Sequence, residues 1–157
     1  MAYFEITVIG AKELERKLSM LPINVAKKHV RTAVREGAKI IQAEEHAMAM
    51  SMVGGEMGGM IANALKVRAA GTKRRGSYGI NVIIDPNKND VFIDVSKSGV
   101  RNYIPAAIEY GHITASGGRV AAIPFGRTAF DNKKTSASAA IERDLLRGIE
   151  IEASRPA

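Results

Sequence analysis

The chain has 157 residues and a net charge of +7 at pH 7, from 23 Lys and Arg against 16 Asp and Glu. It has no cysteine, which excludes disulfides and thiolate metal sites and fits a reducing cytoplasm. No apolar run approaches the roughly 20 residues of a membrane span, and the first ten residues lack the features of a signal peptide. These features predict one water-soluble intracellular domain over residues 1–157, without membrane contact.

The first fifty residues predict one strand and two helices. Residues 3–9 alternate aromatic or β-branched residues with polar ones, as in a strand, and residues 11–21 place leucines on one helical face. Pro22 interrupts this helix, and Asn24 is expected to cap a longer helix over residues 25–48. The polar face of this longer helix carries five cations: Lys27, Lys28, Arg31, Arg35 and Lys39.

Residues 48–60 have an unusual composition, since they hold five of the seven methionines and four glycines. Methionine is adaptable and glycine permits unusual backbone angles, so the segment is predicted to be a flexible loop. Such a loop orders when it contacts a partner. Met57 and Met60 are the candidate contact residues; the alternative is a surface loop with some Met side chains tucked onto the core.

The second half of the chain predicts three strands and two helices. After a helical turn at 60–64, strands are expected at 65–69, 78–84 and 91–95, with a basic loop at about 70–77 and turn formers at 85–90 joining the last two strands as a hairpin. A short helix is expected at 104–110 and a long one at 127–151. The predicted fold is α+β: a small antiparallel sheet of about four strands, with the long helix and the C-terminal helix packed on one face.

No arrangement of residues suggests catalysis, a metal or a cofactor. His29 and His46 lie seventeen residues apart, which does not match the spacing of a zinc-binding helix. The glycines at 54–59 follow a helix and lack the Lys-Ser/Thr ending of a phosphate-binding loop. We therefore expect a protein that is not an enzyme and that uses no cofactor.

The excess positive charge is concentrated between residues 61 and 81, which hold five cations and no acid. Such a segment attracts a phosphate backbone or an acidic protein, although a solvated basic loop gives the same pattern. With few aromatics and no helix-turn-helix or zinc finger, any DNA contact is expected to be independent of sequence. The candidate DNA-facing residues are Lys66, Arg68, Lys73, Arg74 and Arg75.

Residues 103–111 (YIPAAIEYG) and 123–131 (IPFGRTAFD) concentrate proline, glycine and aromatic residues in a chain with few aromatics. Together with residues 9–18 and 58–67 they resemble, in order and spacing, four motifs of the neck or tail-completion (head–tail joining) proteins of long-tailed double-stranded-DNA phages and prophages. Gly58, Ala64 and Thr128 depart from the usual Thr, Ser and Pro of those motifs.

The resemblance implies a structural virion protein that is assembled in the bacterial cytoplasm. It would form a ring, expected to be a hexamer, around the DNA channel. Its partners would be neighbouring neck proteins (a connector or stopper, and the tail terminator or tail tube), with non-specific contact to packaged DNA. The candidate interface residues at the corner before the last helix are Tyr103, Glu109, Tyr110, Phe125, Arg127 and Phe130, with Glu109 pairing with Arg127 or Arg119. The alternatives are that these aromatics belong to the core and Glu109 is solvated, and that the chain is a sequence-independent DNA-binding module.

Overall fold

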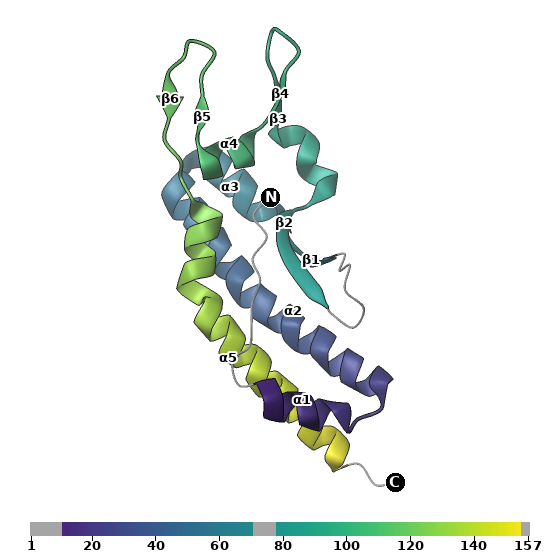
Figure 1. Ribbon diagram of the computed structural model, residues 1–157. Coiled ribbons are helices and arrows are strands. Elements are labelled where there is room, and N and C mark those ends of the chain that lie inside the picture. Colours follow the sequence, from purple (N-terminus) through teal and green to yellow (C-terminus); the bar gives the residue numbers. More distant parts are fainter. Residues whose placement is uncertain (1–10, 71–77, 155–157) are drawn as a thin grey trace.

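A computed structural model describes residues 11–70 and 78–154 of the chain (Figure 1). The α-helices are α1 (Ala11–Ser19), α2 (Ile23–Met48), α3 (Gly55–Ala64), α4 (Ile104–Tyr110) and α5 (Phe125–Ala153), with a π-helical turn η1 (Ala49–Val53) and a 3-10 segment η2 (Pro86–Phe92). The strands are β1 (Leu65–Ala70), β2 (Gly79–Ile84), β3 (Ile93–Val95), β4 (Arg101–Tyr103), β5 (His112–Ile113) and β6 (Arg119–Val120). The α+β class is confirmed, with helices forming most of the structure.

The long helices α2 and α5 lie side by side along the length of the molecule (Figure 1). Small residues let their backbones approach: Ala33 and Gly37 of α2 and Ala137, Ala140 and Gly148 of α5 are all buried. A methyl group added at Gly37 would lie 2.5 Å from Ile141 Cγ1. One added at Gly148 would overlap the His29 ring, whose Nε2 lies 3.1 Å from Glu152 Oε1.

Two apolar clusters lie along this helix pair. At one end α1 crosses the pair (Figure 1), and its Leu14 is buried with Ala33, Ile141 and Leu145. At the other end the core brings together η1, α3, η2 and the start of α5, in the buried residues Ala49, Ile61, Ala62, Ala64, Phe92 and Phe125. This second cluster is the base from which the β-hairpins described below project.

In the described residues the strands form three separate two-stranded antiparallel sheets, β1–β2, β3–β4 and β5–β6, in place of the predicted four-stranded sheet, which is wrong. The predicted hairpin between residues 78–84 and 91–95 is also wrong, since β2 pairs with β1 and β3 with β4. Residues 86–92 form a helical segment because Pro86 fits its first turn and the Asp85 side chain accepts a hydrogen bond from the Asn87 N–H at 3.1 Å. The turn-forming composition of residues 85–90 therefore marks the end of β2, but the segment is helical and not a hairpin turn.

The Met- and Gly-rich segment is ordered rather than a flexible loop. The chain continues from α2 into η1, turns at Gly54 and Gly55 with φ of 68° and 57°, and enters α3. Gly58 faces η1 so closely that a methyl group there would lie 2.6 Å from the Ala49 carbonyl oxygen. The glycines therefore serve a sharp turn and a close contact, which composition alone does not distinguish from flexibility.

The predicted cap of the long helix is wrong, and two other predicted segments cannot be compared with the structure. Pro22, not Asn24, occupies the cap position of α2, and Asn24 lies inside the helix. The strand predicted at 3–9 and most of the basic loop at 70–77 lie outside the described residues.

Gly37→Ala tests the close approach of α2 and α5. We expect a net loss of up to about 2 kcal/mol in the free energy of unfolding, since overpacking costs about 1–3 kcal/mol and the helix-propensity gain is about 1 kcal/mol. Gly59→Ala is the control, because its nearest neighbour would be Met50 Sδ at 4.0 Å. In urea unfolding, Gly59→Ala should be as stable as the parent or more stable. If Gly37→Ala raises the free energy of unfolding as much as Gly59→Ala does, the packing argument is contradicted.

Candidate assembly surface

Two short β-hairpins project beyond the helices at one end of the molecule (Figure 1). We call residues 93–103 and 112–120 the two arms. Each arm is closed by a tight turn: the Ser96 N–H donates to the Val100 carbonyl at 2.9 Å, and the Thr114 N–H to the Gly118 carbonyl at 2.7 Å. Gly99 and Gly117 supply the positive φ angles, 79° and 84°, that these turns require.

The arms expose β-branched apolar side chains. The exposed fractions are 57% for Val95, 56% for Val100, 75% for Ile113 and 43% for Val120. In addition, each arm is only two strands wide, so its outer backbone edges pair with no strand of the described chain. Unpaired strand edges that carry exposed apolar side chains are features of surfaces that bind another chain.

The second arm is tied to the body at its base. The Ile123 N–H donates to the Ile108 carbonyl at 2.8 Å, which joins the end of the arm to α4. Gly111, with φ of 71°, lets the chain leave α4 where a side chain would lie 2.6 Å from the Val120 carbonyl oxygen. The direction of the arm is therefore set by α4 and by the start of α5.

Glu109 joins α4 to α5. Its buried carboxylate accepts the Gly126 N–H at Oε2 (2.9 Å) and the Arg127 N–H at Oε1 (3.1 Å), which satisfies two free donors in the first turn of α5. Arg127 returns the contact, because its Nε donates to Oε1 at 3.0 Å and its Nη2 donates to the Glu109 carbonyl oxygen at 2.8 Å. The charge of Glu109 is thus compensated by a guanidinium and by the positive end of a helix.

A second carboxyl group lies beside this pair. A methyl group on Gly126 would lie 3.2 Å from Glu45 Oε1 and 3.5 Å from Glu109 Oε2, so α2 brings Glu45 to the same point. Burial, and then the nearby charge of Glu109, raise the pKa of Glu45 to about 7. A side chain at Gly126 would press on the Glu45 carboxyl group and touch that of Glu109.

The predicted interface residues separate into inward-facing and exposed ones. Phe125 lies in the chain's own core, and Glu109 is buried as well, so the alternative that Glu109 is solvated is wrong and its pairing with Arg127 is confirmed. Met57, Met60 and Tyr103 are partly buried against the core. Phe130 is also partly buried.

Tyr110 and Arg127 are the exposed members of this set. The Arg127 guanidinium lies 5.1 Å from the centre of the half-exposed Tyr110 ring. Tyr103, in contrast, is partly buried. Its hydroxyl donates to Asn89 Oδ1 at 3.1 Å, and burial raises the pKa of Tyr103. The corner therefore shows a stacked Arg–Tyr pair to its surroundings.

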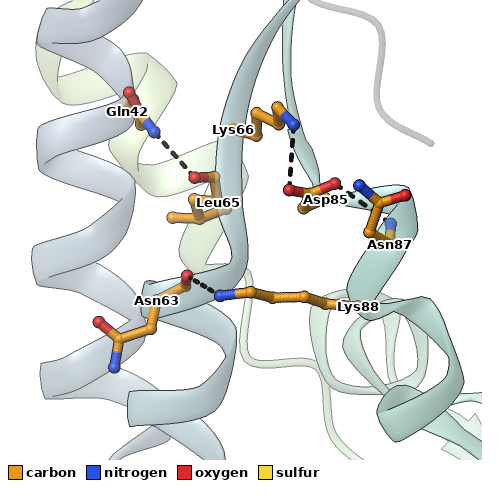
Figure 2. Close-up of polar contacts among 7 residues, drawn as sticks. All are labelled: Gln42, Asn63, Leu65, Lys66, Asp85, Asn87 and Lys88. Atoms are coloured by element: carbon orange, nitrogen blue, oxygen red, sulfur yellow. Dashed lines mark hydrogen bonds and ion pairs between the residues drawn. The ribbon is translucent and has the colours of Figure 1, made fainter.

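The candidate DNA-facing residues are placed only in part. Lys66 Nζ donates to Asp85 Oδ2 at 3.1 Å, a contact drawn in Figure 2. The backbone hydrogen bond from Asn87, and then this bond from Lys66, lower the pKa of Asp85. Arg68 is exposed on the same strand, and Lys73, Arg74 and Arg75 lie outside the described residues.

Sequence reasoning missed the arms as a surface. Their turns were visible as Ser98-Gly99 and Ser116-Gly117-Gly118, and their strands as short β-branched pairs. The sequence does not show that the described part of the chain leaves these strands uncovered. Their exposure depends on the tertiary arrangement, which has no local sequence signal.

Within the described residues, no group of three or more His, Cys, Asp or Glu could hold a metal ion. A shallow groove of about 280 Å³ is lined by Lys39, Gln42, Ala43, His46, Ala62 and Leu65, so neither Glu45 nor Glu109 opens into it. No helix in the described part of the chain has the length and apolar character needed to cross a bilayer. Comparison of the chain with family models, curated proteins and solved structures found no match.

Glu109→Gln tests the cap on α5. The neutral amide loses a charge-assisted pair with Arg127 and places an NH₂ group against backbone donors, so we expect a loss of about 2–3 kcal/mol in unfolding free energy. Glu44→Gln is the control, because its contacts with Asn132 and Lys133 are at the surface and should cost about 0.5 kcal/mol or less. Both variants are unfolded in urea at the same protein concentration. Equal losses of unfolding free energy in Glu109→Gln and Glu44→Gln would refute the role of Glu109 as a cap on α5.

Glu45→Gln tests the raised pKa through the pH dependence of stability. Between pH 4.5 and about 7 the folded chain keeps the Glu45 proton while the unfolded chain has lost it, so stability falls as pH rises through this window. Because Glu45 keeps some contact with water, we expect Glu45→Gln to gain about 1–2 kcal/mol relative to the parent at pH 8 and little at pH 4. A difference that does not change with pH would contradict the shift.

Proposed function

We propose that this chain is a structural subunit of a phage neck, which assembles with copies of itself into a ring at the head–tail interface and uses its two arms as the main contact. The resemblance of four sequence segments to head–tail joining proteins supports this proposal. The physical basis is the pair of arms, which expose apolar β-branched residues and unpaired strand edges at one end of a helical body.

The last two resembling segments meet in space. Residues 103–111 contain Glu109, and residues 123–131 contain the Gly126 and Arg127 groups that bind it. The second arm emerges between these two segments, so the same polar contact that begins α5 also fixes where this arm points. A fixed arm direction would let neighbouring subunits bind at a constant angle, as a ring requires.

The proposed ring uses the arms in a head-to-tail contact. Both arms extend from the same end, so contact with a neighbour's helical body uses different patches on the two subunits. Such a head-to-tail contact closes into a ring when the rotation between subunits permits. The exposed Tyr110 and Arg127 lie next to the second arm, at α4 and α5, and would extend the contact surface.

The arm variant Val95→Thr/Ile113→Thr tests the proposal. Threonine keeps the β-branched shape but adds a hydroxyl group, so the arms should fold while their apolar contact weakens. We expect the parent to form a ring in negative-stain electron microscopy and light scattering, and the variant to shift at least tenfold in concentration toward monomer.

The matched control is Ile23→Thr/Ile151→Thr, which alters two side chains that are 68% and 46% exposed but lie outside the arms. It should assemble like the parent. Loss of assembly in the control alone would refute the arms as the contact. A parent that is monomeric in solution and absent from virions would refute the neck function.

A further inference from the structure

A row of cations runs along the exposed side of α2. Lys27, Arg31, Arg35 and Lys39 follow at intervals of four residues, which places them one above another over about 18 Å of helix, and Lys28 lies beside them. All five side chains are exposed. Between residues 27 and 39 the only acid is Glu36, which accepts a hydrogen bond from Lys39 at 2.8 Å. We call these five residues the cationic row.

The row is not neutralised by the rest of the described chain. Lys27, Lys28 and Arg35 form no ion pair with any described residue, and Arg31 is held 5.6 Å from the ring centre of Tyr78 instead of a carboxylate. Like charges four residues apart destabilise a helix by about 0.2–0.5 kcal/mol per pair, and α2 has three such pairs. Its first turn also has no acidic residue to offset the nearby cations.

The row leads into the shallow groove between α2 and β1. Lys39 and His46 lie on the α2 side of this groove, and Gln42 Nε2 donates to the Leu65 carbonyl at 2.9 Å, which holds β1 in place (Figure 2). On β1, Lys66 is neutralised by Asp85, while Arg68 is exposed and forms no ion pair with a described residue. The positive surface therefore centres on α2, and the β1–β2 hairpin borders it.

The composition of the row favours a nucleic acid over a protein partner. Protein interfaces have an apolar or aromatic centre, but none of the large apolar side chains between residues 27 and 39 is exposed. An anionic membrane would engage the exposed Met20 and Ile23 near one end of α2 and not a straight row along the helix. Along the axis of a duplex each strand places one phosphate about every 3.4 Å, so a stretch of axis as long as the row, about 18 Å, carries about five phosphates per strand.

We propose that the cationic row of α2 binds the phosphate backbone of duplex DNA without reading its sequence. This binding differs from the assembly contact, because the row lies on α2 and the arms lie elsewhere. It does not rest on the neck function: a chain that fails to form rings can still bind DNA through the row. The basic loop holding Lys73, Arg74 and Arg75 is the competing location.

The experiment measures binding of two unrelated 30-base-pair duplexes by fluorescence anisotropy over a range of salt concentrations. We expect equal affinity for both duplexes, and a slope of log affinity against log salt of about −4, since four or five phosphates are neutralised. Lys27→Gln/Lys28→Gln/Arg35→Gln should reduce the slope by about three and the affinity at 0.1 M salt by about 100-fold. Glutamine keeps the helix propensity of α2.

The matched control, Lys134→Gln/Arg143→Gln/Arg147→Gln, removes the same charge from exposed positions of α5 and should retain most of the affinity and the slope. Several outcomes would overturn the proposal: no binding at low salt, equal losses in both triple variants, or a loss only in Lys73→Gln/Arg74→Gln/Arg75→Gln. Polyglutamate or phosphatidylserine vesicles that bind as tightly, with the same dependence on the row, would also overturn it. Assembly of each variant is read separately by light scattering, so a failure of DNA binding is distinguished from a failure of the ring.

Discussion

The close contact between α2 and α5 is the constraint on which the rest of the structure depends. Two helices of 26 and 29 residues approach through glycine and alanine, and Gly37 and Gly148 leave room for Ile141 and the His29 ring. The helix pair gives both apolar clusters a common wall, with α1 at one end and α3, η1 and η2 at the other. Because the interior is close-packed, a side chain added at Gly37 would displace Ile141 and the cluster around it.

The second fixed point is the start of α5, where three elements meet at Gly126. Glu109 comes from α4, Glu45 from α2 and the backbone donors from α5 itself. Arg127 and the helix end compensate the charge of Glu109, which forms the cap. Burial, and then the nearby negative charge of Glu109, make a second carboxylate costly here and raise the pKa of Glu45 to about 7. A contact of this kind fixes distance and angle more tightly than apolar packing, because its hydrogen bonds are directional.

The sequence predicted the features that depend on local residue patterns, such as the positions of the helices. The apolar spacing of residues 25–48 predicted α2, and Pro105 and Gly111 predicted the short helix between them. The sheets were not predictable in the same way, because alternation indicates that 65–69 and 78–84 are strands but not which strands pair. The Met- and Gly-rich segment misled for a related reason: Gly58 is there to meet the Ala49 carbonyl, a contact that exists only once α3 has folded back on η1. The candidate site followed the same division: the motifs predicted that Glu109 pairs with Arg127 or Arg119, and the structure selects Arg127, while the exposure of Val95 and Ile113 was not predicted.

The folded chain carries two surface features that its own stability does not require. Exposed valine and isoleucine on the arms gain nothing from burial, and the cationic row of α2 repels itself along the helix. The two features are separated, because the arms lie past one end of the helix pair and the row begins near the other end of α2 (Figure 1). A surface that is apolar in one place and strongly cationic in another is suited to two chemically different partners at once, since a protein neighbour on the arms would leave the row open to a polyanion.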